Sequence, residues 1–234
     1  KASPKEMLPI VNKPLVQYGV EEALDAGLFE IAFVTGRGKR TINDHFDISY
    51  ELEHQIAGSD KEKHLVGIRN GQTLIGDEPF GVILADDLCI NEGGDGVMAQ
   101  MVKIYKQVRC SIVAIEEVPE DQIHKFGVIA GDAVRDDLYR VTNMVEKPTA
   151  AEAPSNLAII GRYILTPDIF DLIRQTPPGK NGEVQITDAL MQQAREGCVM
   201  AYKFKGRRFD CGSVDGFVEA TNYCYKHFYQ QGKL

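Results

Sequence analysis

A change of hydrophobic pattern near the start of the sequence constrains the fold most. Apolar residues recur at helical spacing over residues 15–26, and Gly27 marks the end of this expected helix. The short apolar run at residues 31–35 then predicts a buried strand. A helix followed by a buried strand is typical of a sheet covered by helices. The sequence therefore favours an α/β fold.

Apolar runs farther along the chain predict more elements of both kinds. The expected strands lie at 81–85, 111–116, 126–129, 138–146 and 157–165, and the expected helices at 98–106, 167–175, 186–194 and 215–228. The strands at 126–129 and 138–146 flank an expected turn at Gly131-Asp132. No repeat, low-complexity stretch or linker interrupts the chain, so residues 1–234 are expected to form a single domain.

Charge and cysteine usage exclude several classes of function. The net charge of −8 argues against a general nucleic-acid or anionic-membrane surface. No run approaches the roughly 20 apolar residues that span a bilayer, and no signal peptide is visible. The five cysteines are odd in number and form no CxxC, which predicts free thiols in a cytoplasmic protein.

Three prolines make residues 4–15 a stiff, extended loop, because proline fixes φ and is excluded from a helix interior. Lys5 and Lys13 lie in this loop. A rigid loop that carries lysines suits an anionic ligand, because its backbone is ordered before binding.

Carboxylates follow two of the extended segments. Asp86-Asp87 ends an apolar run, and Asp210 follows the extended residues 205–209. In open α/β sheets, ligands bind outside the carboxyl ends of strands, and such carboxylates suit a magnesium ion that also holds substrate phosphates. The alternative for Asp86-Asp87 is a solvated turn, and for Asp210 an N-cap or turn residue.

Glu146-Lys147 ends another expected strand, directly before a proline. Strand alternation directs the two side chains to opposite sides, so separate partners are favoured over a salt bridge between them. A lysine suits a phosphate, and a glutamate can accept hydrogen bonds from sugar hydroxyls. Gly127 and Gly161 mark either a close approach of a ligand to the backbone or a β-bulge. Residues 182–188 have the pattern of a helix start.

These segments together resemble the bacterial UTP–glucose-1-phosphate uridylyltransferases, within the nucleoside-diphosphate-sugar pyrophosphorylases. The match is in order over nearly the whole chain: PKEMLP at 4–9, NKPL at 12–15, GDEPF at 76–80, VILADD at 82–87, FGV at 126–128, VEKP at 145–148, APSNLAIIGRY at 153–163, TPPG at 176–179, EVQITD at 183–188 and DCG at 210–212. Any one fragment is weakly specific, and the ordered set is highly specific.

The resemblance implies a Rossmann-like, mixed, mostly parallel sheet flanked by helices. The N-terminal part would bind the nucleotide, and about 110–234 would bind the sugar phosphate and close the fold. The implied reaction transfers a uridylyl group from UTP to glucose 1-phosphate, with magnesium as cofactor, in a homodimer or homotetramer.

The resemblance also implies residue roles: Lys5 on the nucleotide phosphates, Asp86 and Asp210 on magnesium, Gly127 and Glu146 on the glucose hydroxyls, Lys147 on the phosphate of glucose 1-phosphate, Gly161 in the sugar pocket, and Asp87 beside the metal site. Two departures from the family pattern stand out. The family's glycine-rich loop is expected before Pro4 and its base-recognising segment before Gln72, and this sequence shows neither of them. Because that segment decides the base, a sister enzyme using dTTP, CTP or ATP stays open, as does an inactive sugar-nucleotide-binding subunit.

Overall fold

The computed structural model describes residues 4–34, 75–179 and 184–232, and their contacts divide the chain into two compact units. The first, here called the terminal unit, comprises Lys1–Leu74, Leu84–Ile90 and Arg207–Leu234. The second, here called the central unit, comprises Ile75–Ile83 and Asn91–Gly206.

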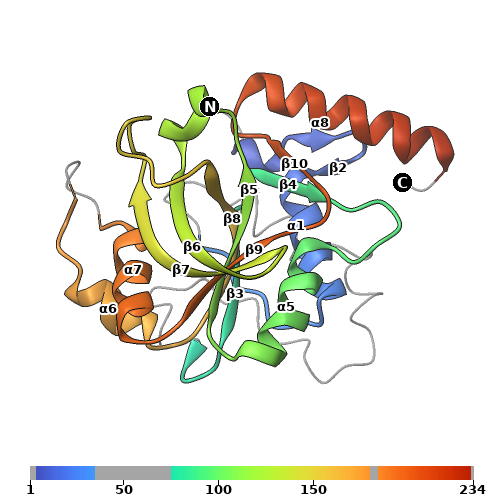
Figure 1. Ribbon diagram of the computed structural model, residues 1–234. Helices are drawn as coiled ribbons and strands as arrows, with labels where there is room; N and C mark the ends of the chain where they lie inside the picture. The colour runs from blue at the N-terminus through green and yellow to red at the C-terminus, as the bar shows by residue number, and fades with distance from the viewer. Residues whose placement is uncertain (1–3, 35–74, 180–183, 233–234) are drawn as a thin grey trace. The chain divides into compact units, whose positions relative to one another are not determined.

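Short strands and two long helices build the described part of the terminal unit (Figure 1). Its elements are η1 (Lys5–Met7), β1 (Pro9–Ile10), β2 (Lys13–Pro14), α1 (Leu15–Asp25), β4 (Asp87–Ile90), β10 (Arg207–Asp210), α8 (Val214–His227) and η3 (Tyr229–Gln231). The proline-rich loop is extended only in part: β1 and β2 pair over two residues each, whereas Lys5–Met7 form the 3-10 helix η1. Val11 has a positive φ of 64° and makes the turn between β1 and β2.

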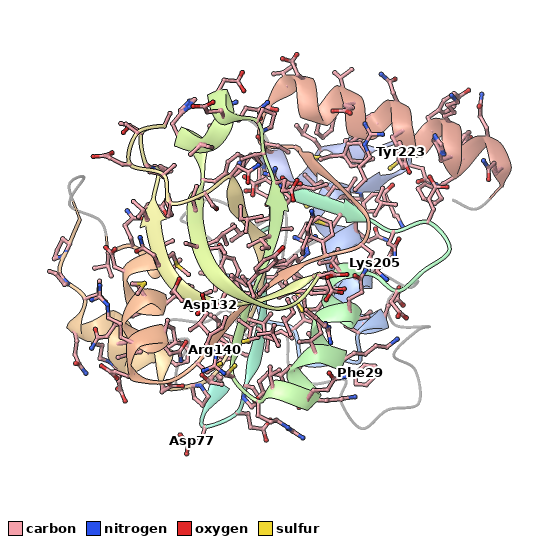
Figure 2. All side chains as sticks on the ribbon, in the orientation of Figure 1. Phe29, Asp77, Asp132, Arg140, Lys205 and Tyr223 are labelled. Carbon is pink, nitrogen blue, oxygen red and sulfur yellow. The ribbon has the colours of Figure 1, made fainter. Side chains whose placement is uncertain are left out.

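The core of the terminal unit joins its first residues to its last helix. Ile10, Leu15 and Leu88 are buried together with Phe209, Ala220 and Cys224. The Phe209 ring lies 5.0 Å from the ring of Tyr223, which Figure 2 labels on α8. This packing fixes β10, and with it the chain that leads to Asp210, against α8.

A six-stranded mixed sheet forms the centre of the central unit. Its elements are β3 (Phe80–Ile83), α5 (Val97–Val108), β5 (Ser111–Glu117), η2 (Glu120–Lys125), β6 (Gly127–Arg135), β7 (Leu138–Glu146), β8 (Leu157–Leu165), α6 (Ile169–Gln175), α7 (Ile186–Glu196) and β9 (Val199–Lys203). The strand order is β3-β8-β5-β9-β7-β6, and an added β6–β8 pairing closes the sheet on itself.

The mixed α/β class is confirmed, and the sheet departs from expectation in one respect. The β5–β9 pairing is parallel, whereas the other pairings of this sheet are antiparallel. The described sheet is therefore mostly antiparallel rather than mostly parallel. The cause is the long β6–β7 hairpin, which needs no helical crossover, together with β8, which runs antiparallel to each of its neighbours.

Helices flank this sheet, with α6 and α7 to one side of it and α5 to the other in Figure 1. The core includes Val113, Ile129, Ile169 and Leu190, all with no exposed surface. The helix that begins at Ile186 is thus anchored on the sheet through apolar contacts, and its first turn has a fixed position.

Two local predictions were wrong. Residues 31–34 carry no strand assignment, although a strand was expected at 31–35; residue 35 itself lies outside the described part. The turn expected at Gly131-Asp132 lies inside β6, and the chain reverses instead after Arg135. The register shifts between Ala130 and Gly131, so the glycine accommodates a bulge and the strand continues.

Candidate active site

Lys5, Asp86 and Asp210 come together in the terminal unit. The Lys5 Nζ donates a hydrogen bond to Asp86 Oδ2 over 2.5 Å. A Cβ placed on Gly212 would lie 3.0 Å from Asp210 Oδ1, 3.2 Å from Asp86 Oδ2 and 3.6 Å from Lys5 Nζ. The three charged groups therefore surround one backbone position that has room only because it is a glycine.

Strand pairing explains why residues so far apart in the sequence converge here. The antiparallel β4–β10 ladder sets Asp210 opposite Asp87. The Cys211 N–H then donates to the Asp86 carbonyl over 2.8 Å, which fixes Asp86 diagonally across from Asp210. Asp210 Oδ1 also accepts from the Gly212 N–H at 3.0 Å, so the turn interpretation of this residue holds as well.

The carboxylates control the charge of Lys5. Its hydrogen bond to Asp86 raises the pKa of Lys5 above its usual range, against a lowering by burial, and the charges of Asp86, Glu6 and Asp210 add to the rise. Lys5 is therefore a permanent cation at neutral pH. Its side chain is 41% exposed, so the cation remains accessible to an anionic ligand.

The same cluster fits a magnesium ion. Two carboxylates face one small space, and oxygen atoms are the ligands that this cation prefers. Among the described residues, no group of three or more histidine, cysteine, aspartate or glutamate side chains could hold a metal. Two carboxylates with the remaining positions left to phosphate and water are the usual arrangement for magnesium in phosphoryl-transfer sites.

Asp87 has a charged partner of its own in Arg208. Its side chain is 8% exposed, and Arg208 donates to its Oδ1 from Nε at 2.8 Å and from Nη2 at 2.7 Å. Arg208 is itself 10% exposed. A charge-assisted pair this well buried favours a structural role for Asp87 in joining β4 to β10.

Glu146 and Gly127 form a second cluster, in the central unit. They pair directly across the β6–β7 hairpin. Thr187 on α7 donates from Oγ1 to Glu146 Oε2 over 3.2 Å. A Cβ on Gly127 would lie 2.8 Å from Thr187 Cγ2 and 3.1 Å from Glu146 Oε2, so no larger residue fits without displacing one of them.

The backbone of Lys147, directly after β7, is not in a strand conformation. Its φ is +45°, a left-handed value that is unusual for a residue with a side chain and disfavoured before a proline. The Lys147 N–H donates to the Phe126 carbonyl over 2.9 Å, which holds the backbone in this conformation.

The sequence-based prediction that Glu146 and Lys147 point apart was wrong. Strand alternation ends at Glu146, and the turn at Lys147 brings Nζ to 3.8 Å from Glu146 Oε1. The Lys147 side chain is 59% exposed, so it remains available to an external anion.

Gly161 lies in a bulge of β8. Val113 of β5 pairs with Tyr163, and Ile115 pairs with Ile159, so residues 160–162 all face Ala114. The bulge interpretation of this glycine is therefore correct. Its carbonyl accepts a hydrogen bond from Nη1 of Arg162, a cation with 1% exposure.

Thr187 is the functional candidate that sequence reasoning missed. It lies in the first turn of α7, is 3% exposed, and touches both Glu146 and the space next to Gly127. The helix-start pattern at 182–188 predicted its secondary structure, but no local pattern could reveal a partner 41 residues earlier in the chain.

Comparison with known proteins gives the family. The family model described as "Nucleotidyl transferase" matches residues 1–227. The UTP–glucose-1-phosphate uridylyltransferase of Pseudomonas aeruginosa PAO1 is 65% identical, with 100% of this chain and 92% of the relative covered. This chain belongs to the UTP–glucose-1-phosphate uridylyltransferase family. The resemblance argued from the motifs is therefore confirmed.

Further relatives support the same family assignment. The Bacillus subtilis enzyme of the same name is 40% identical, over 94% of this chain and 83% of the relative. The solved structure of a UDP-glucose pyrophosphorylase complexed with UDP-glucose is 52% identical, with a TM-score of 0.87 over 95% of this chain and 90% of that one. The Pseudomonas alignment extends over 257 residues, so that relative has at least 23 residues with no counterpart among the 234 of this chain.

Proposed function

We propose that this chain transfers the uridylyl group of UTP to glucose 1-phosphate and releases pyrophosphate. The observation that carries the proposal is the 65% identity to a UTP–glucose-1-phosphate uridylyltransferase over the full length of this chain. In the reaction, a phosphate oxygen of glucose 1-phosphate attacks the α-phosphorus of UTP in line. The bond from that phosphorus to the pyrophosphate oxygen breaks. The nucleophile is already an anion, so no general base is required.

Catalysis then reduces to positioning and charge neutralisation. Lys147 would hold the phosphate of glucose 1-phosphate, because it is an exposed cation on a backbone fixed by Phe126. Glu146 would accept hydrogen bonds from the glucose hydroxyls through Oε1, since Thr187 already engages Oε2. Gly127 would keep this space open, and Gly161 is proposed to line the sugar pocket.

Lys5 would neutralise charge on the nucleotide phosphates and on the departing pyrophosphate. Its fixed positive charge and its partial exposure support this role. Asp86 and Asp210 would hold magnesium, which when bound draws the nucleotide phosphates together and offsets their charge. The hydrogen bond from Lys5 to Asp86 also restrains that carboxylate before substrate arrives.

A substrate panel tests this proposal. The chain is incubated with glucose 1-phosphate, magnesium and one of UTP, dTTP, CTP or ATP, and pyrophosphate release is followed. We expect UTP to be turned over at least about tenfold faster than the other three. Faster turnover of another triphosphate would identify a sister enzyme. Binding of UDP-glucose by calorimetry without any turnover would identify an inactive sugar-nucleotide-binding protein.

Domain organisation and assembly are further parts of the proposal. The chain passes four times between the terminal and central units, which supports one nucleotidyltransferase domain over residues 1–234. Four exposed apolar side chains on or beside α8 support a homodimer or homotetramer: Val214, Val218, Tyr225 and Tyr229. Light scattering on the purified chain measures the assembly. Within the described residues, no helix has the length and apolar character needed to cross a membrane.

A further inference from the structure

Two cysteines meet in the central unit, at a place that the proposed transfer does not use. Cys110 precedes β5 and Cys198 precedes β9, and their sulfur atoms lie 3.0 Å apart. Both side chains are partly exposed. The other three cysteines, Cys89, Cys211 and Cys224, belong to the terminal unit.

The strand register sets the two cysteines side by side. Strands β5 and β9 are parallel, and their ladder begins with Ser111 opposite Val199, one residue after each cysteine. Neighbouring strands are about 4.8 Å apart, which falls within the Cα separations of about 4.4–6.8 Å seen across disulfides. The sulfur atoms need to approach by about 1 Å to reach the bonded distance, which rotation about the Cα–Cβ bonds supplies.

We propose that Cys110 and Cys198 are an oxidation site at which hydrogen peroxide forms a reversible disulfide. In the first step, the sulfur of one cysteine attacks one peroxide oxygen. The O–O bond breaks, one water leaves, and that cysteine becomes a sulfenic acid. The sulfur of the other cysteine then attacks the sulfenic sulfur, the S–O bond breaks, and a second water leaves. The two thiols lose two electrons and two protons, and one peroxide becomes two waters.

Burial raises the pKa of the Cys110 thiol to about 12, its hydrogen bond to Cys198 adds to the rise, and Arg140 opposes it. Because the thiolate is the reactive form, oxidation should become faster as the pH rises. Arg140, labelled in Figure 2, lies on β7 opposite Met200 of β9, two residues from Cys198.

The bond would close a long loop within one unit. The two cysteines are 88 residues apart in the sequence, so a cross-link would remove much of the freedom of the unfolded chain. We expect the midpoint of thermal unfolding to rise by about 5 °C or more in the oxidised protein, and to fall back on reduction.

The test uses the purified chain with and without hydrogen peroxide, followed by dithiothreitol. We expect the oxidised chain to lose 2 Da, and a digest without reductant to contain the peptides of Cys110 and Cys198 joined. The Cys89→Ser control should behave like the wild type, whereas Cys110→Ser and Cys198→Ser should neither cross-link nor gain thermal stability.

Other outcomes would overturn the proposal. One is a sulfinic acid on either cysteine with no joined peptide in the wild-type digest. Another is a disulfide that joins other cysteines. The wild-type digest distinguishes these outcomes by itself, even if a serine variant folds poorly.

Discussion

Gly127→Ala is the sharpest single test of the cluster of Gly127, Glu146 and Thr187, which we propose binds the sugar. The added Cβ would lie 2.8 Å from Thr187 Cγ2, whereas carbon atoms in contact prefer about 3.5–4.0 Å. Thr187 is 3% exposed, and Glu146 Oε2 also lies only 3.1 Å from the same Cβ, so both side chains must shift. Overpacking of this kind costs about 1–3 kcal/mol of folding free energy, or roughly 2–12 °C in the unfolding midpoint.

The functional cost follows from the displaced carboxylate. Loss of one hydrogen bond to a charged group costs about 1.5–3 kcal/mol, which corresponds to a rise of roughly 10- to 150-fold in KM for glucose 1-phosphate. Initial rates of pyrophosphate release at varied glucose 1-phosphate measure this value. KM for UTP serves as the internal control and should change less than about twofold.

A second substitution tests whether the contact with the Thr187 methyl group causes these losses. Thr187→Ser removes the Cγ2 methyl at 2.8 Å but keeps the hydroxyl that donates to Glu146. In the Gly127→Ala background it should recover at least about 0.5 kcal/mol of stability and part of the lost affinity. The reasoning would be refuted by a Gly127→Ala protein with wild-type KM and thermal stability, or by a double variant no better than Gly127→Ala alone.

Three further predictions concern other described groups. Thr187→Val should raise KM for glucose 1-phosphate about tenfold in steady-state assays while Thr187→Ser leaves it near wild type, because only the valine removes the donor to Glu146. Asp210→Asn should raise the magnesium concentration for half-maximal rate at least about tenfold in a magnesium titration; an unchanged titration curve would remove Asp210 from the metal site. At pH 9, iodoacetamide should alkylate Cys110 in the native protein far more slowly than in urea, because a pKa of about 12 leaves on the order of 0.1% thiolate where an ordinary cysteine has about 75%. Equal rates would contradict the raised pKa. The raised pKa also makes folding stability depend on pH. The native thiol keeps its proton where the unfolded one releases it, so the contribution of Cys110 to stability falls as pH rises above about 8.5.

Local signals explain which parts of the fold the sequence could predict. Strand β8 was predicted with the bounds that it has, because its run of β-branched and aromatic residues at 157–165 is a strong local pattern. Helix α1 was predicted to within a residue at its end because its apolar residues recur at helical spacing. The pairing of strands could not be predicted in this way. Strand β3 pairs with β8 across about 80 residues, and nothing in either segment specifies the partner or its direction.

The residues of the candidate site were likewise predictable only in part. Lys5, Asp86 and Asp210 were singled out as charged residues beside extended segments, and the β4–β10 ladder supplies the convergence that the sequence left open. The proximity of Lys147 to Glu146 required a positive φ that the sequence rule for residues before proline argues against. Thr187 acts through a partner 41 residues away, so only the packing of α7 on β7 reveals it.

The assignment of glucose 1-phosphate to Glu146 and Lys147 is the central claim, and Lys147→Gln tests it most directly. Glutamine keeps much of the side-chain bulk and removes the charge, while the hydrogen bond from the backbone N–H to the Phe126 carbonyl is retained. Initial rates at varied glucose 1-phosphate and varied UTP should give a KM for glucose 1-phosphate raised at least about tenfold, with KM for UTP within about twofold of wild type. An unchanged KM for glucose 1-phosphate, or an equal rise in both KM values, would contradict the account.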